Sequence, residues 1–230
     1  MNTKDMLLEA LKVFKSELEQ IDSWFEPASR KSSRDYERWG PIDFIAHSAA
    51  YIDRRVKILS DPEAVKTIDN GDELDDMNRS IFEAHLDSAW EDVVGMLKSG
   101  LASLREVAIE KSEAELSAPD PLSPERPVWR GVAFYGIVHT LSHLGLALVR
   151  EGNNDKAVSL QRQMTQNLKA ISDSKPWTAL IEYNHARILA LTQDPEALEH
   201  LNRAIAIDPA FAKRAEHDPD FISIRDRIEF

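Results

Sequence analysis

A long apolar stretch at positions 131–149 constrains most strongly how this chain can fold. It is long enough to raise the question of a membrane span. However, it contains His139 and His143 and stands alone among amphipathic neighbours, whereas ionisable residues are rare in membrane spans. We therefore expect a buried central helix and no membrane partner.

The rest of the chain also favours helix. It contains only 8 glycines among its 230 residues, and long stretches are rich in Ala, Leu, Glu, Lys and Arg, which are good helix formers. No convincing alternating run predicts a strand. The fold class expected is all-α.

Helix boundaries follow from apolar spacing and from proline. Leu7, Leu11, Phe14 and Leu18 recur at steps of four and three, so they predict a first amphipathic helix. Pro41 starts a second helix that runs to about residue 59. We expect a short helix at about 75–86, then a longer one launched by a capping box at 88–91. Four prolines within 117–127 predict an ordered loop before the apolar helix.

Gly152 and the two asparagines after it predict a helix stop and a domain boundary. The chain then divides into 1–152, a bundle, and 153–230, a tail of short helices that start at Asp-Pro pairs. Part of this tail resembles one tetratricopeptide repeat shortened by one residue, at Ala186, Leu189, Ala197, Leu201, Ala204 and Pro209. We expect these helices to pack on the bundle or on each other; a peptide-binding module is the alternative.

Charge and cysteine content exclude several classes of function. The formal net charge is -12 with a pI near 5.1, so the field of the protein repels phosphate backbones and anionic membranes, and nucleic acid is not expected as a partner. The absence of cysteine excludes disulfides, thiolate ligands and a cysteine nucleophile. It suits a reducing cytosol, and positions 1–20 lack the apolar core of a secretory signal. We expect a cytoplasmic protein.

Three histidines predict a metal site. His139 and His143 are four residues apart, so they share one face of a helix, and both lie in the most apolar segment, where a buried imidazole needs a hydrogen bond or a metal. His47 lies in a second apolar helix. Three imidazoles leave a coordination position open, as in catalytic sites. Zinc is the default ion, and nickel or iron also suits imidazole; core histidines with ordinary polar partners are the alternative.

The same residues resemble a known family. Positions 39–47, WGPIDFIAH, are similar to the second-helix signature of DinB-like proteins, and HTLSH at 139–143 is similar to the paired histidines of their last bundle helix. The resemblance covers about 1–152. It implies a four-helix bundle with a long crossover between helices 2 and 3, and His47, His139 and His143 as metal ligands. Members of the family include thiol-dependent isomerases and transferases and some hydrolases, so the resemblance does not fix the reaction.

Helical phase adds further candidates around the three histidines. Asp43 and Tyr51 lie one turn either side of His47, so they are the predicted acid-base or hydrogen-bonding partners. Arg54 and Arg150 are predicted to bind an anionic substrate. Gly136 either leaves room for substrate or allows close helix packing.

The other four histidines are not expected at the metal site, and the HTLSH motif disfavours one class of metalloenzyme. His85, His185, His200 and His217 are predicted to be surface or capping residues. Thr140 stands where a zinc peptidase of the HExxH type places its glutamate base, which disfavours peptidase activity.

The leading hypothesis is a metal-dependent enzyme that acts on a small-molecule substrate. The resemblance to DinB-like proteins implies thiol transfer, with a low-molecular-weight thiol as a co-substrate, or hydrolysis. The alternative is a non-catalytic protein that binds or sequesters a metal or ligand and whose tail mediates protein interaction. Either is compatible with a homodimer. An open metal position beside a pocket favours the enzyme, and an exposed apolar groove in the tail favours the module.

Overall fold

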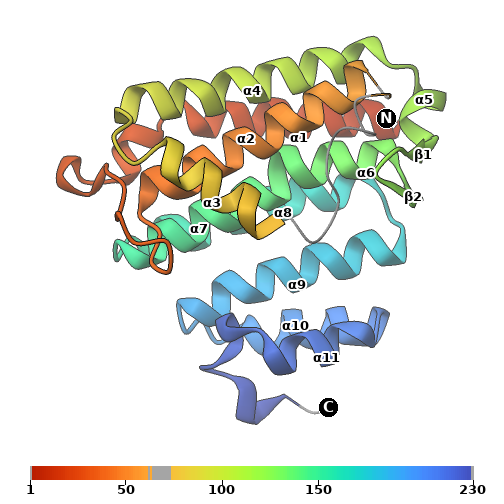
Figure 1. Cartoon of the computed structure of the whole chain (residues 1–230). Helices are drawn as coiled ribbons and strands as arrows, with labels where there is room; N and C mark the ends of the chain where they lie inside the picture. Colours follow the sequence, from red (N-terminus) through yellow and green to blue (C-terminus); the bar gives the residue numbers. More distant parts are fainter. Residues whose placement is uncertain (1, 62, 64–73, 229–230) are drawn as a thin grey trace.

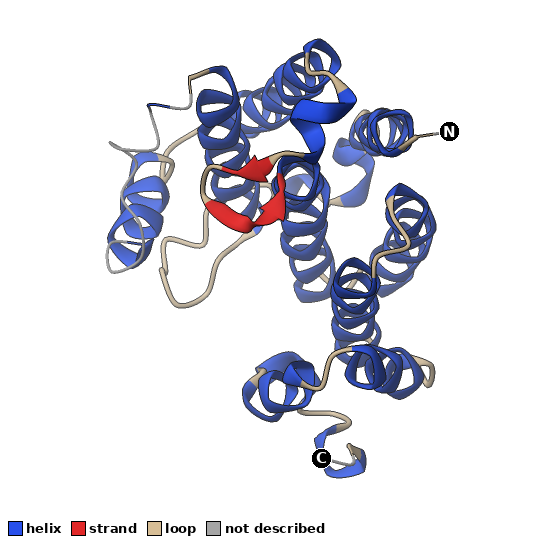
Figure 2. Ribbon diagram, turned by 90° about the vertical axis from the view of Figure 1, so that its right-hand side faces the viewer, coloured by secondary structure: helices blue, strands red, loops and turns tan. Residues whose placement is uncertain are grey.

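The computed structural model of the chain describes residues 2–61, 63 and 74–228, and over these residues it is all-α with one short hairpin, which confirms the predicted fold class (Figures 1 and 2). The helices are Thr3–Leu18 (α1), Pro41–Ser60 (α2), Leu74–Ala84 (α3), Trp90–Glu110 (α4), Glu113–Ser117 (α5), Val128–Ala133 (α6), Thr140–Arg150 (α7), Asn154–Ile171 (α8), Lys175–Leu191 (α9), Ala197–Ile207 (α10) and Ala210–His217 (α11). The strands are Pro119–Asp120 (β1) and Ser123–Pro127 (β2).

Local signals explain how the first two helices begin. The Asn2 side chain accepts a hydrogen bond from the backbone N–H of Asp5, and the predicted apolar stripe of α1 is buried. In α2, Pro41 occupies the first turn and Asp43 Oδ2 accepts a hydrogen bond from the N–H of Gly40 at 2.7 Å. This contact fixes the direction in which the chain enters α2.

The larger hydrophobic core lies among α1, α2, α4 and the α6–α7 segment. α2 packs against α4 and α7, and α1 packs against α4 (Figure 1). The connection from α2 to α4 contains α3, which lies against α2. Among the described helices, the continuous segment Val128–Arg150 is the one long and apolar enough to cross a membrane, and most of it is buried inside the protein. The segment is therefore mostly buried, as we expected for the central helix.

The tail continues this core. α8 packs on α1, α7 and α9, and it buries Leu160, Met164 and Leu168 in the same cluster as the bundle residues. Trp177, at the start of α9, is fully buried and meets the ring of Trp129 edge to face at 5.2 Å. The predicted boundary near Gly152 thus falls between two helices that share one core.

A second, smaller core forms between α9, α10 and the C-terminal turns, away from α1 and α4 (Figure 1). It contains five of the six residues on which the repeat resemblance depends, Ala186, Leu189, Ala197, Leu201 and Ala204. α9 contributes to both cores, because Leu180 and Ile188 face the bundle and Tyr183 faces α11. α9 therefore joins the two cores, while the repeat resemblance itself stays a prediction.

The proline-rich segment is ordered, as expected, but it contains the β1–β2 hairpin that periodicity did not predict. The predicted capping box at 88–91 is wrong. α4 begins at Trp90 after Ala89, with no side-chain cap, and the Ser88 hydroxyl contacts Nδ1 of His85 at 2.9 Å instead.

Candidate metal centre

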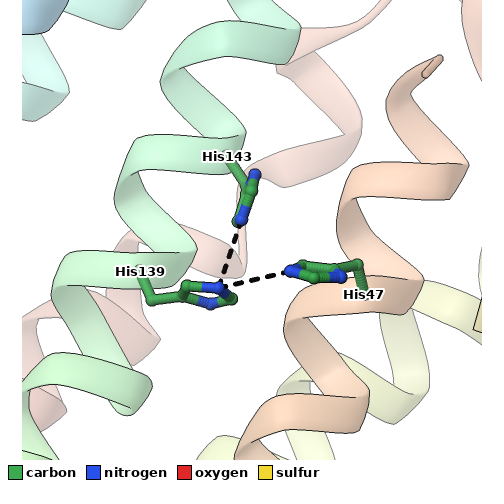
Figure 3. A group of neighbouring side chains, drawn as sticks. All are labelled: His47, His139 and His143. Atoms are coloured by element: carbon green, nitrogen blue, oxygen red, sulfur yellow. Dashed lines mark hydrogen bonds between the residues drawn. The ribbon is translucent and has the colours of Figure 1, made fainter. Parts of the chain in front are cut away.

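The three predicted ligands converge in space. His47 lies on α2, His139 ends the π-helical turn Phe134–His139 (η4), and His143 lies on α7. Figure 3 shows the three rings pointing toward one another across the gap between the two helices. Nε2 of His139 lies 3.2 Å from Nε2 of His47 and 3.2 Å from Nε2 of His143. One ring nitrogen from each residue lies within 4.8 Å of the others.

A π-helical turn, η4, leads into the pair of histidines, and the α turn that follows it places both of them on one face. A π turn is wider than an α turn, and such turns occur mostly as single turns inside α-helices, frequently at functional sites. The turn ends at His139, and regular α-helix follows, so His143 lies one α turn further on the same face. The sequence shows the spacing of the pair but carries no signal for the π turn.

Burial keeps the three imidazoles neutral. Desolvation, and then the neighbouring His139, lower the pKa of His47 to about 3. Desolvation lowers the pKa of His139 to about 4. The pKa of His143 is held well below its ordinary value by desolvation, and then by His139, His47 and the Arg187 cation. Neutral imidazole is the form that ligates a metal ion, so the site needs no deprotonation near neutral pH.

Aromatic side chains surround the three rings. Trp39 lies with its ring centroid 5.0 Å from that of His47, and the Tyr51 ring lies 4.5 Å from His47 and 4.9 Å from His139. Phe44 lies 5.5 Å from His143. These contacts restrict the rotation of the imidazoles and hold the nitrogens in place. His47 is buried, whereas His139 and His143 are half-buried.

The group fits a divalent metal ion in its donor set. Three neutral nitrogens suit zinc, nickel or iron, and among the described residues this is the one cluster of histidine and carboxylate side chains with such spacing. Nδ1 of His47 and Nδ1 of His139 are buried without a hydrogen-bond partner in the described part of the chain. Metal-ligating histidines usually have such a partner, so here packing alone orients these two rings.

Tyr51 lies beside the histidines, as predicted. Its hydroxyl donates a hydrogen bond to Oδ1 of Asn78 on α3 at 3.1 Å. Burial is the main cause that raises its pKa, and Tyr135 adds to this effect while the Arg54 cation opposes it. The phenol therefore stays protonated and can act as a hydrogen-bond donor.

Asp43 has a structural role. Its Oδ2 accepts hydrogen bonds from the N–H of Ser33 at 2.9 Å and from the Ser33 hydroxyl at 3.1 Å, in addition to the one from Gly40. The carboxylate thus fastens the preceding loop to the start of α2. These contacts favour a cap over the predicted acid-base role.

The three residues predicted to contact substrate lie in different places. Arg54 is half-buried on α2. Arg150 is exposed; it donates to the Trp39 carbonyl at 2.9 Å and lies over the Phe44 ring at 5.1 Å, so it supports the aromatic wall. A Cβ at Gly136 would come within 2.7 Å of Leu104 and 3.0 Å of Leu11. Gly136 therefore allows close helix packing, the other role considered for it.

A pocket of about 180 Å³ opens beside His139 and His143. The bundle contributes Phe134, Val138, Ser142 and Leu146, and the tail contributes Leu180, Asn184, Arg187 and Arg214. Ser142 lies inside the HTLSH motif, but the residues of the tail carried no sequence signal, because only tertiary packing brings α9 and α11 to α7.

Two histidines predicted at the surface are buried in the tail, so that prediction is wrong for them. His185 is 4% exposed and its ring lies 4.0 Å from that of His200, which is 8% exposed. His200 Nδ1 lies 2.5 Å from Oε2 of Glu182, and Lys169 donates to Oε1 of the same carboxylate at 2.6 Å. His217 is exposed, and His85 is half-buried. Polar neighbours in the sequence, Glu182, Asn184 and Arg187, favoured a surface position for His185, but Glu182 and Asn184 are themselves buried.

Comparison of the chain with models of known protein families, with curated proteins and with solved structures finds no match. The resemblance to DinB-like proteins therefore stays a prediction that depends on the two short motifs.

Proposed function

We propose that this protein is a metal-dependent enzyme that acts on a small molecule through a divalent ion held by His47, His139 and His143. The observation that supports this most is the convergence of three neutral ring nitrogens within 4.8 Å from two different helices. Nε2 of His139 has either one hydrogen or one lone pair, so it can make one good hydrogen bond to its two neighbours, whereas a shared cation would accept a lone pair from all three rings.

A divalent ion bound there would act as a Lewis acid toward a substrate oxygen or sulfur. The three protein ligands would leave at least one coordination position open, as in catalytic zinc sites. Zinc is the ion we propose first, and nickel or iron would also suit the three imidazoles.

The protein's own residues would handle the substrate. The pocket beside His139 and His143 would admit a small molecule. Tyr51, whose ring lies near His47 and His139, is not among the residues that line this pocket, so its hydroxyl would donate to a substrate at the metal only by exchanging its hydrogen bond with Asn78. The resemblance to DinB-like proteins suggests thiol transfer, with a low-molecular-weight thiol as co-substrate, or hydrolysis. The geometry favours neither reaction.

Binding without turnover is the second candidate. The pocket is lined by bundle and tail together, so a ligand held there would contact both parts, which also suits sequestration of a small molecule or a ligand-dependent interaction through the tail.

Metal content tests the proposal. Protein purified without chelator and offered zinc or nickel should hold about one equivalent, and His139→Ala should lose most of it because one of three ligands is gone. His217→Ala, at an exposed histidine, is the matched control. Wild-type protein that binds far less than one equivalent would rule out the site.

Activity then separates the two candidates. We expect thiol transfer to small electrophiles, or hydrolysis of simple esters and amides, to disappear on chelation and return with added metal. Turnover that survives His143→Ala would contradict the mechanism. Metal binding without turnover on any of these substrates would favour the binding protein.

A further inference from the structure

Two arginines from the tail line the pocket at the histidines. Arg187 lies on α9 and Arg214 on α11, opposite His139 and His143 of the bundle. No carboxylate is among the described residues that line this pocket. Two cationic side chains thus line the pocket, while Asp218 and Asp220, which pair with Arg187, are not among the residues that line it.

Two aspartates that do not line the pocket hold the Arg187 side chain in place. Its Nε donates to Oδ2 of Asp220 at 2.8 Å and lies 3.4 Å from Oδ2 of Asp218, and its Nη2 lies 2.5 Å from the same Oδ2 of Asp220. The remaining nitrogen, Nη1, has only a long contact of 3.4 Å with Oδ1 of Asn184, a residue that also lines the pocket. The two carboxylates thus orient the guanidinium and leave one edge of it for a ligand.

Arg214 is less constrained. Its guanidinium lies over the Tyr183 ring, 4.9 Å from the centroid, and in the described part of the chain no carboxylate pairs with it. It is exposed at the rim of the pocket. An anion that entered the pocket would meet this cation at the rim as well as Arg187, and both arginines could donate to it.

The other residues that line the pocket, and its volume, limit the polarity and the size of the ligand. Phe134, Val138, Leu146 and Leu180 are apolar. The volume, about 180 Å³, is below the roughly 300–1,000 Å³ of pockets that hold drug-sized ligands. A peptide or nucleotide would not fit, whereas a small acid with an apolar body would.

We infer that the substrate or ligand of this site is a small organic carboxylate, with its carboxylate bound by Arg187 and Arg214 and its apolar body against Phe134 and Leu180. This inference extends the proposed function, because it places the other end of the molecule at His139 and His143. It also makes the tail part of the binding site.

The test is calorimetric titration of the full chain, metal-loaded and metal-free, with benzoate and butanoate and with their uncharged amides. Loss of a charge-assisted hydrogen bond weakens binding by roughly tenfold. We expect the acids to bind at least about tenfold more tightly than the amides, and Arg214→Gln to remove most of this preference.

Arg203→Gln is the matched control, because Arg203 lies on α10, pairs with Glu199 and does not line the pocket. It should leave the preference for acids unchanged. Arg187→Gln should weaken binding of the acids as well. Its effect is compared with that of Arg214→Gln because Arg187 also neutralises Asp218 and Asp220.

The outcomes separate this inference from the proposed function. Equal binding of acids and amides, no binding of either acid, or an undiminished preference in Arg214→Gln would overturn the carboxylate subsite, even in protein that holds its metal. Failure to bind metal, with an arginine-dependent preference for acids intact in the metal-free protein, would overturn the metal enzyme and keep the subsite.

Discussion

Arg55 on α2 and Asp120 on β1 form a buried, two-point ion pair that ties the helix of His47 to the segment leading into the helix of His139 and His143. The side chains are 1% and 3% exposed. Arg55 also donates to the Val128 carbonyl at 3.1 Å, at the start of α6. This pair therefore sets the relative positions of the two helices that carry the three histidines.

Removal of one partner of this pair should be costly, because the other charge would remain buried and unpaired. We expect Asp120→Ala to reduce the free energy of unfolding by about 3–5 kcal/mol. Urea denaturation measures this. Asp53→Ala removes an exposed pair with Lys57 at 2.7 Å and should cost less than about 1 kcal/mol. Equal losses of unfolding free energy in the two variants would mean that the buried pair stabilises the protein no more than an exposed pair does.

The structural role of Asp43 is separable from a catalytic one. Asp43→Ala removes three hydrogen bonds at the start of α2, so the protein should lose about 1–2 kcal/mol of stability and keep its metal. Asp43→Asn retains an acceptor oxygen and should restore part of the loss. Turnover that is abolished in Asp43→Asn, at unchanged stability, would instead support the acid-base role.

Two glycines in helices provide a test of packing. A Cβ at Gly136 would press on Leu104 and Leu11, whereas a Cβ at Gly95 of α4 would meet no atom within 4 Å. Gly136→Ala should destabilise the protein by about 1–3 kcal/mol, and Gly95→Ala should stabilise it by up to about 1 kcal/mol. Thermal unfolding compares the two. A Gly136→Ala protein of normal stability that no longer binds the acids would indicate a substrate-facing position.

His185 should make the protein sensitive to acid. Desolvation, followed by the effect of His200, lowers its pKa to about 3, and both ring nitrogens are buried without a hydrogen-bond partner among the described residues. The unfolded chain, with a pKa of about 6.5, binds a proton that the folded protein does not. Stability due to neutral His185 is therefore present above pH 6.5 and is lost as the pH falls toward 3.

His185→Leu tests this pH dependence, because leucine fills the site without titrating. At pH 5 the difference in unfolding free energy between variant and wild type should have moved by about 2 kcal/mol in favour of the variant, relative to pH 7. Urea denaturation at a series of pH values provides the measurement. Parallel stability curves for the two proteins would show that His185 does not couple folding to protons in this range.

The tail should not behave as an independent module. A fragment that ends near Gly152 loses the buried side chains of α8, so it should keep its helicity and its metal but melt at a markedly lower temperature. In the full chain, Leu160→Ala in the larger core and Leu201→Ala in the smaller core should each cost about 2–5 kcal/mol, within a single unfolding transition. Two separate transitions, or a fragment with the full melting temperature, would show that bundle and tail fold separately.

The sequence by itself determined the helical fold class, the start of α2, the central buried helix and the three histidines. These features depend on local rules: the 3.6-residue period of apolar side chains, the fixed φ of Pro41, and the spacing of His139 and His143 by one turn. Such signals are contained within a few residues, so they can be read without knowledge of the fold.

Only the tertiary structure decided the rest of the site. Arg55 and Asp120 are far apart in sequence, and so are His143 and Arg187, and no local period relates residues that meet across helices. The burial of His185 and the packing of Gly136 also depend on which helix faces them. Contacts between helices are selected by the packing of whole faces, and this selection placed two arginines of the tail beside the histidines of the bundle.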